Sequence, residues 1–126
     1  MLLVSLALST AGCDLPPGPS APIVTETFTG AIVAQGFSVY RFAVRSTSIV
    51  SVRLSQVDPA AVALGLGLGT PKDDADCTLL SSNPDAFVQA KPQISVTTNA
   101  GGYCVQVFDT GHVSGSAAFS VVITHS

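Results

Sequence analysis

The sequence predicts an all-β fold: a single antiparallel β-sandwich of about eight strands with jelly-roll or Greek-key connections. Apolar residues alternate with small polar residues along most of the 126-residue chain, and this is the period of a strand buried on one face. Clusters of Gly, Pro, Asn, Asp and Ser separate the alternating runs at the short intervals typical of sandwiches. The only helix-compatible segment, residues 84–90, is too short to connect parallel strands.

Four strands are expected in the first part of the chain, at residues 25–30, 37–44, 50–55 and 62–69. Along the second of them, Tyr40, Phe42 and Val44 share one face. The fourth alternates large aliphatic residues with one alanine and three glycines, so one of its faces is almost bare. We therefore expect this strand to pack on one side only.

Four more strands are expected in the second part, at residues 78–80, 94–97, 103–108 and 119–124. Turn signals separate the strands at residues 34–36, 46–47, 58–59, 69–76, 83–84, 99–102 and 110–115. The chain is 47% hydrophobic and 10% charged, which excludes a disordered protein. Its length suits one domain.

The most recognisable element of the chain is Ala-Gly-Gly-Tyr-Cys-Val-Gln-Val at residues 100–107. Together with Thr29-Gly30, Tyr40-Arg41-Phe42, the leucine strand at 62–68 and the closing strand at 119–123, it resembles the bacterial pre-peptidase C-terminal domains. These are small jelly-roll sandwiches attached to secreted proteins. The resemblance covers roughly residues 26–124 and implies an accessory role in substrate binding, secretion or stability, with calcium binding in some members. No catalytic domain accompanies it in this sequence.

A short apolar run leads into a cysteine near the start of the chain. Residues 1–8 are far fewer than the about 20 apolar residues that a transmembrane helix needs, and Ser9-Thr10-Ala11-Gly12 connect them to Cys13. This layout resembles the lipobox of bacterial lipoproteins, which implies cleavage before Cys13 and a diacylglycerol on its thiol. It departs from that pattern in having no Lys or Arg before Cys13 and Thr10 where Leu is usual. An ordinary secretory signal and a buried cysteine are the alternatives.

This interpretation divides the chain into three regions. Residues 1–12 are a signal peptide or its truncated remnant, residues 13–24 a lipidated N-terminus with a Pro-rich tether, and residues 25–126 the β-sandwich domain. Pro-rich segments are extended and semi-rigid, so they hold a domain a short distance from its anchor. The expected location is the bacterial cell envelope, on the extracytoplasmic side, facing the periplasm or exposed at the surface.

The charge distribution excludes polyanionic partners. The five basic residues are scattered and the net charge is −3; they are Arg41, Arg45, Arg53, Lys72 and Lys91. A nucleic-acid interface needs a basic patch, and anionic lipid needs a polybasic segment. We therefore expect that neither nucleic acid nor anionic lipid binds the chain through its charges. No cofactor is expected either.

The two cysteines outside the lipobox, Cys77 and Cys104, are an even pair in a chain that looks exported, so we expect a disulfide between them. Closing a loop of about 28 residues is worth roughly 3 to 4 kcal/mol. Strand alternation places Cys104 opposite Tyr103 and Val105, so the bridge is expected on the outside of a sheet. Two free thiols are the alternative.

No catalytic constellation is predicted. His112 lies in a Gly- and Ser-rich loop, and His125 is the penultimate residue, so both are expected to be solvated. The Gly-x-Ser-x-Gly and His-Glu-x-x-His motifs are both absent from the sequence. Two histidines so placed also lack zinc-ligand spacing.

The acidic residues Asp73, Asp74 and Asp76 are the best candidates for metal chemistry, because several carboxylates in one loop can bind Ca²⁺. They lack the spacing, the glycine and the final glutamate of an EF-hand loop. A solvated loop is therefore expected and no metal site is predicted, with these three residues as weak calcium candidates. Asp85 and Asp109 join them only if the fold brings their loops together.

Aromatic residues offer one more route to function, because exposed aromatic rings stack on sugars. Tyr40 and Tyr103 follow the bulky face of their strands and are expected in the core. Phe87 lies outside the alternating runs, so the pattern assigns it less clearly to the core or to the surface. Phe108 is out of phase with its strand, and it marks either an exposed contact surface or a cover for the bare glycine face at residues 62–69.

These observations predict a lipid-anchored, non-catalytic β-sandwich that acts as a structural or interaction module at the cell envelope. Its partners would be the membrane, through Cys13, and a protein or glycan at the cell surface. The alternative is a ligand-binding module for glycan, peptide or calcium that uses the loops at residues 70–76 and 110–116.

Overall fold

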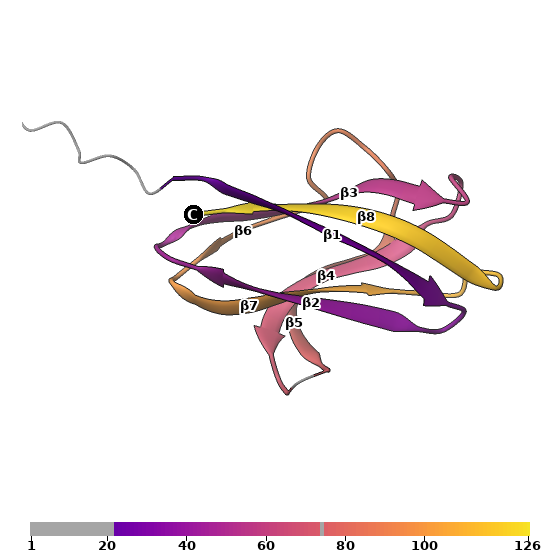
Figure 1. The fold of residues 1–126 in the computed structure, drawn as a ribbon, viewed down its shortest axis with the longest axis horizontal. Coiled ribbons are helices and arrows are strands. Elements are labelled where there is room, and N and C mark those ends of the chain that lie inside the picture. The colour runs from indigo at the N-terminus through magenta and orange to yellow at the C-terminus, as the bar shows by residue number, and fades with distance from the viewer. Residues whose placement is uncertain (1–21, 74) are drawn as a thin grey trace, which may run out of the picture.

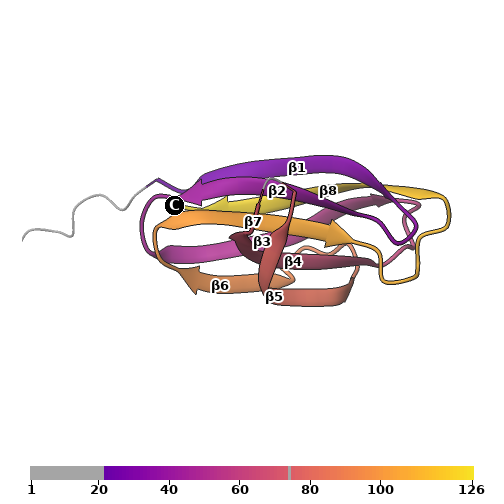
Figure 2. The same ribbon diagram turned by 90° about the horizontal axis from the view of Figure 1, so that it is seen from below.

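The computed structural model describes residues 22–73 and 75–126, which form eight strands in two packed sheets (Figure 1). The strands are β1 (Val24–Val33), β2 (Phe37–Val44), β3 (Ser48–Asp58), β4 (Leu64–Pro71), β5 (Cys77–Ala86), β6 (Ile94–Thr98), β7 (Gly101–Phe108) and β8 (Ser116–His125). One sheet has the order β1-β8-β3-β6 and the other β2-β7-β4-β5, with antiparallel neighbours throughout. This order is that of a jelly roll, so the predicted all-β sandwich is confirmed. Figure 2 shows the two layers from below.

The core lies between the sheets and follows from the alternation along the strands. Val50, Val52 and Leu54 of β3 are fully buried, as are Val121 and Ile123 of β8. The residues between them turn to the outer face and are more exposed. Full burial of one such aliphatic side chain is worth roughly 1.5 to 3 kcal/mol, so these strands supply much of the driving force for folding.

Strand β4 is buried on both faces, and the prediction that it packs on one side only is wrong. Its leucines point into the core, while the glycines that alternate with them are also buried. The ring of Phe108 occupies the position of a side chain at Gly65, and Leu79 covers Gly67. The second alternative for Phe108, a cover over the glycine face, is therefore confirmed.

The start of β5 folds over the outer face of β4. Cys77 of β5 and Cys104 of β7 have Cα atoms 6.0 Å apart, although β4 lies between their strands. Strands two positions apart in a flat sheet are separated by about 9.6 Å. At Gly69 an added Cβ would fall on the carbonyl oxygen of Thr78. The backbone of β5 therefore crosses the space where β4 has no side chains.

Two sequence signals within β5 misled the prediction. The strand was expected at residues 78–80, but it continues through the predicted turn at Asn83-Pro84 to Ala86. Proline lacks the amide hydrogen of a ladder bond and is tolerated on edge strands and at bulges. Strand β5 is such an edge, and its register with β4 shifts beside Pro84. No helix forms over the helix-compatible residues 84–90.

The substitution Gly69→Ala tests the close approach of β5. Because the new methyl group would meet backbone rather than a movable side chain, we expect the free energy of unfolding to fall by about 3 kcal/mol. Urea denaturation measures this change. Gly102→Ala on β7 is the matched control, since nothing lies within 4 Å of its added Cβ, and it should change stability by about 1 kcal/mol or less. Equal effects of the two substitutions would contradict the packing described for β4.

Candidate functional site

The cysteines were predicted to serve two roles, and the structure describes one of them. Cys77 and Cys104 form a disulfide with an S–S distance of 2.02 Å, as predicted. Cys104 points to the outer face of its sheet, yet it is fully buried because the base of the β4–β5 hairpin lies over it. Cys13 and the signal segment at residues 1–12 lie outside the described residues, as does most of the tether at residues 13–24.

The acidic loop at the tip of the β4–β5 hairpin makes ordinary turn contacts. Asp73 Oδ1 accepts a hydrogen bond of 3.0 Å from the Ala75 amide, and the Lys72 amide donates to the Asp76 carbonyl oxygen at 3.1 Å. Asp74 lies outside the described residues. Across residues 22–73 and 75–126, no group of three or more His, Cys, Asp or Glu residues is placed to hold a metal ion.

The loops at residues 70–76 and 110–116, predicted to share a ligand site, lie at opposite ends of β4. The first follows the end of that strand, at Pro71. The second follows β7, whose last residue Phe108 pairs with Gly65 near the start of β4. A strand of eight residues is roughly 25 Å long. In Figure 1 the hairpin tip hangs below the sandwich and the loop after β7 lies at its right-hand end. One small ligand cannot contact both loops.

Asp109 organises the loop after β7. Its Oδ1 accepts hydrogen bonds of 2.9 to 3.0 Å from the amides of Gly111, His112 and Val113, and its Oδ2 accepts one of 2.8 Å from the Gln35 amide. The bond from Gln35, helped by the three loop amides, lowers the pKa of Asp109 to about 2 although desolvation opposes the shift. Sequence reasoning missed this role. The signal was an Asp two residues before a Gly, which is typical of a turn capped by a side chain.

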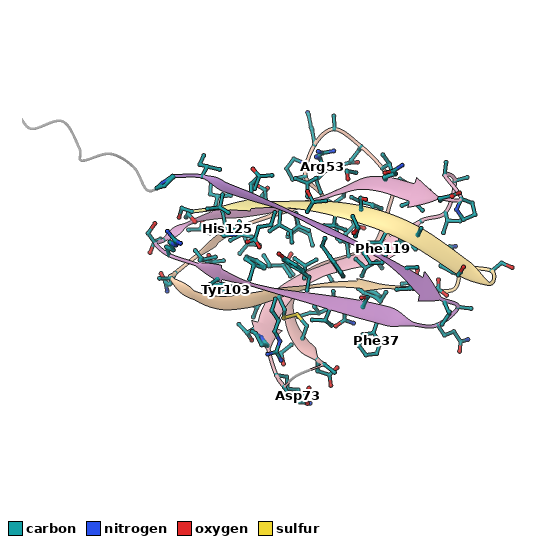
Figure 3. All side chains as sticks on the ribbon, viewed as in Figure 1. Phe37, Arg53, Asp73, Tyr103, Phe119 and His125 are labelled. Atoms are coloured by element: carbon teal, nitrogen blue, oxygen red, sulfur yellow. A yellow bond between two sulfur atoms is a disulfide. The ribbon has the colours of Figure 1, made fainter. Side chains whose placement is uncertain are left out.

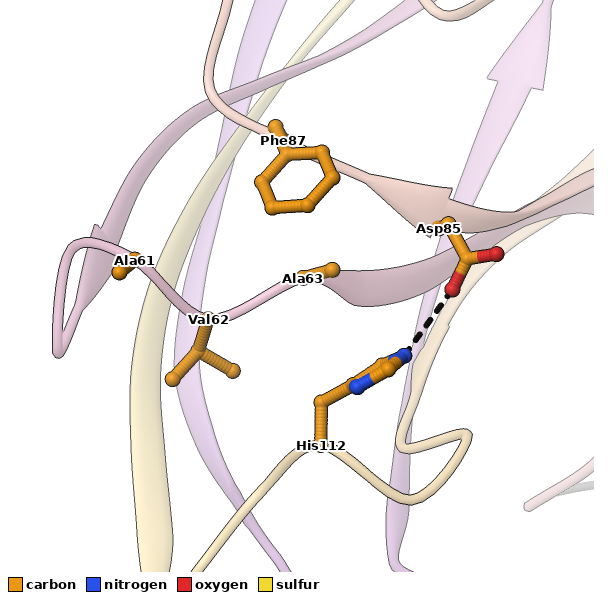
Figure 4. A pocket seen from close by; sticks show the side chains of 6 residues that line it. All are labelled: Ala61, Val62, Ala63, Asp85, Phe87 and His112. Carbon is orange, nitrogen blue, oxygen red and sulfur yellow. Dashed lines mark hydrogen bonds and ion pairs between the residues drawn. The ribbon is translucent and has the colours of Figure 1, made fainter.

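The ordered loop presents His112 to Asp85, which lies near the end of β5. His112 Nε2 and Asp85 Oδ1 are 3.1 Å apart, and both side chains are at least half exposed. His112 is therefore solvated, as predicted, but it has a fixed partner. The pair borders a hollow of about 530 Å³ whose other lining residues are Ala61, Val62, Ala63 and Phe87 (Figure 4). Asp85 thus belongs to this hollow and not to the acidic hairpin tip.

His125 is buried, and the prediction of a solvated tail residue is wrong. It ends β8 in phase with Val121 and Ile123, and only 4% of its surface is exposed. Its ring packs against Phe42 with the ring centroids 5.0 Å apart, and Figure 3 shows it inside the end of the sandwich. The prediction assumed fraying near the last residue. Continuing the alternation of β8 one step beyond Ile123 would have identified an inward position.

Glu26 of β1 connects His125 to Tyr40 of β2. Its Oε2 lies 2.5 Å from His125 Nε2, and its Oε1 accepts a hydrogen bond of 2.5 Å from the Tyr40 hydroxyl. Burial acts to raise the pKa of Glu26, but the hydrogen bonds from Tyr40 and His125 and the charge of the histidine outweigh it and lower the pKa. The bond to Glu26, followed by desolvation, raises the pKa of Tyr40.

The two ring nitrogens of His125 both face oxygen acceptors. Nε2 faces the Glu26 carboxylate, and Nδ1 lies 3.0 Å from the Ser126 carbonyl oxygen. In this arrangement neither nitrogen is directed at a hydroxyl or thiol that it could activate as a nucleophile. The cluster instead joins the edge strands β1 and β2 across the sandwich and ties the end of β8 to them.

Both tyrosines pack against the core, as predicted, with their hydroxyl groups at its margin. The Tyr40 ring stacks on Phe28 at 5.2 Å between centroids. The Tyr103 hydroxyl donates a hydrogen bond of 2.8 Å to the Asn99 carbonyl oxygen. Phe87 behaves differently, because 54% of its surface is exposed beside the hollow.

Comparisons with known proteins identify no relative of this chain. No protein-family model matches it, and no curated protein is significantly similar to it. The described part of the chain contains no helix long and apolar enough to cross a membrane. The resemblance to pre-peptidase C-terminal domains therefore stays a prediction from the residues.

Asp109→Asn tests the organising role of Asp109. The folded-state pKa of this group, about 2, lies below its ordinary value of 3.8. Its ionised form therefore contributes stability above pH 3.8 that is lost as the pH falls toward 2. We expect the variant to be less stable than wild type at neutral pH and the difference to shrink over this interval, as measured by thermal unfolding. Asp73→Asn at the hairpin tip is the control. A difference that stays constant down to pH 2 would rule out the assigned role.

Proposed function

We propose that this chain is a lipid-anchored, non-catalytic β-sandwich that serves as a structural or interaction module at the bacterial cell envelope. The observation that carries the proposal is the run of small residues leading into Cys13 after a short apolar segment. A thiol in this position would receive a diacylglycerol. The two acyl chains of that group suffice for stable membrane attachment, whereas one chain gives only marginal binding.

The disulfide supports a location outside the cytoplasm. Disulfides persist in oxidising compartments and are rare where thiols are kept reduced. The bond between Cys77 and Cys104 is consistent with export of the chain. It also leaves Cys13 as the remaining cysteine available for modification.

The position of the first strand supports a short tether. Strand β1 begins at Val24, so the Pro-rich residues 14–23 would separate the lipid from the domain. Proline-rich chain rises about 3.1 Å per residue in its extended form. The sandwich would therefore stand close to the membrane, held by its acyl chains, since its scattered basic residues offer no polybasic attraction to lipid.

A ligand-binding role is the second candidate, and the hollow beside His112 favours it. This hollow uses the loop at residues 110–116 without the loop at residues 70–76. The loops at residues 70–76 and 110–116, which were predicted from the sequence to share one ligand site, would therefore not form a site together.

Mass spectrometry of the mature N-terminus tests the anchoring. We expect the chain to begin at Cys13 with the added mass of a diacylglyceryl group, and Cys13→Ser to move the protein from the membrane fraction to the soluble fraction. Thr10→Leu is the matched control, because it places Leu at the position where the lipobox pattern usually has it and should preserve or increase processing. An unmodified Cys13 in the exported protein would overturn the proposal.

A further inference from the structure

We propose that the hollow between Phe87 and the His112–Asp85 pair binds a neutral sugar unit of a glycan. The inference deepens the proposed function by naming the class of partner, and it rests on that function only for the location at the cell surface. Three segments that are distant in sequence converge on the hollow: the β3–β4 connection, the end of β5 with the residues after it, and the loop after β7.

The shape of the hollow suits one ring of a longer chain. Its volume of about 530 Å³ lies within the about 300 to 1,000 Å³ of small-molecule sites. The small side chains of Ala61 and Ala63 leave room along the segment that passes between Phe87 and His112 in Figure 4. The hollow is largely open to solvent, so neighbouring units of a polymer could continue out of it.

Phe87 supplies the apolar contact. Its surface is 54% exposed, whereas Phe28, Phe42 and Phe119 are buried in the core. The face of an aromatic ring carries negative charge density that attracts the slightly positive C–H groups on one face of a sugar ring. An exposed ring beside polar groups is the arrangement that such stacking requires.

His112 and Asp85 supply the polar contacts. The Asp85 carboxylate accepts hydrogen bonds from hydroxyl groups, and an imidazole can donate or accept them. The structure holds the two side chains 3.1 Å apart, with the carboxylate 61% exposed. Neither Lys nor Arg lines the hollow, so an anionic ligand would meet the Asp85 carboxylate without a compensating charge. This favours a neutral glycan.

The backbone around the hollow is held in place before any ligand arrives. Asp109 fixes the amides of the loop that carries His112, and Thr110 Oγ1 donates a hydrogen bond of 3.1 Å to the Pro84 carbonyl oxygen. On the opposite side, Gln93 Nε2 donates to the Phe87 carbonyl oxygen at 2.5 Å, and Gln93 Oε1 accepts from the Leu54 amide of β3 at 2.8 Å. A preorganised site avoids part of the entropy cost of binding.

Titration of the isotopically labelled full chain with chitotriose, cellotriose and mannotriose tests the inference by amide chemical shifts. We expect saturable shifts centred on Phe87 and His112 with at least one of these trisaccharides. Phe87→Ala and His112→Ala should each weaken binding about tenfold. Both side chains are exposed, so the variants are expected to fold.

Two variants serve as matched controls. Phe37→Ala removes a phenylalanine of similar exposure, 51%, that does not line the hollow. Asp76→Asn removes a carboxylate at the hairpin tip. Both should bind within about twofold of wild type. The sugars are tested up to about 10 mM, well above the about 1 mM Kd of a weak site. If none of the three gives saturable shifts at that concentration, the inference is overturned. Unchanged binding by both Phe87→Ala and His112→Ala would also overturn it. The readout does not depend on acylation of Cys13, so the failure of either proposal can be told from the failure of the other.

Discussion

The contact between the glycine face of β4 and the strand that crosses it is the constraint on which the rest of the structure depends. Any side chain at Gly69 would collide with the backbone of β5, and the disulfide from Cys77 to Cys104 holds the start of β5 in this position. A disulfide between strands two places apart in a sheet requires the strand between them to be bare on that side. The alternating glycines of β4 meet this requirement, so the disulfide and the glycines depend on each other.

The same contact places the residues of the candidate site. Phe108 packs on Gly65 and is followed directly by Asp109, whose carboxylate orders the loop that carries His112. Strand β5, held against β4, brings Asp85 to that loop at its far end. The hollow is therefore a consequence of how β4 is covered. The Glu26, Tyr40 and His125 cluster works separately, closing the opposite edge of the sandwich at β1 and β2.

Alternation in the sequence predicted most of the fold, and its failures have physical causes. Strand β2 was predicted at its observed limits because Tyr40, Phe42 and Val44 alternate along it and turn signals lie on both sides. Strand β5 was predicted to be too short because Asn83-Pro84 is a turn signal that a strand tolerates only at an edge or a bulge. The disulfide was predicted from the number of cysteines and from the expectation that the chain is exported. The pairing of His112 with Asp85, 27 residues apart, could not be predicted because only the jelly-roll connections bring them together. The burial of His125 was missed through an assumption about chain ends.

In this account, the contact between the glycine face of β4 and strand β5, held by the disulfide, supports the rest of the structure. Amide hydrogen exchange in wild type and in the Cys77→Ala/Cys104→Ala variant tests this claim most directly. Loss of a native disulfide costs about 2 to 5 kcal/mol, and exchange shows where that cost appears. If the disulfide holds β5 over β4, the amides of residues 79–81 in the variant should lose clearly more protection than those of Val52 and Val121 in the opposite sheet. Protection that falls equally in both sheets, or that is retained in β5, would contradict the account.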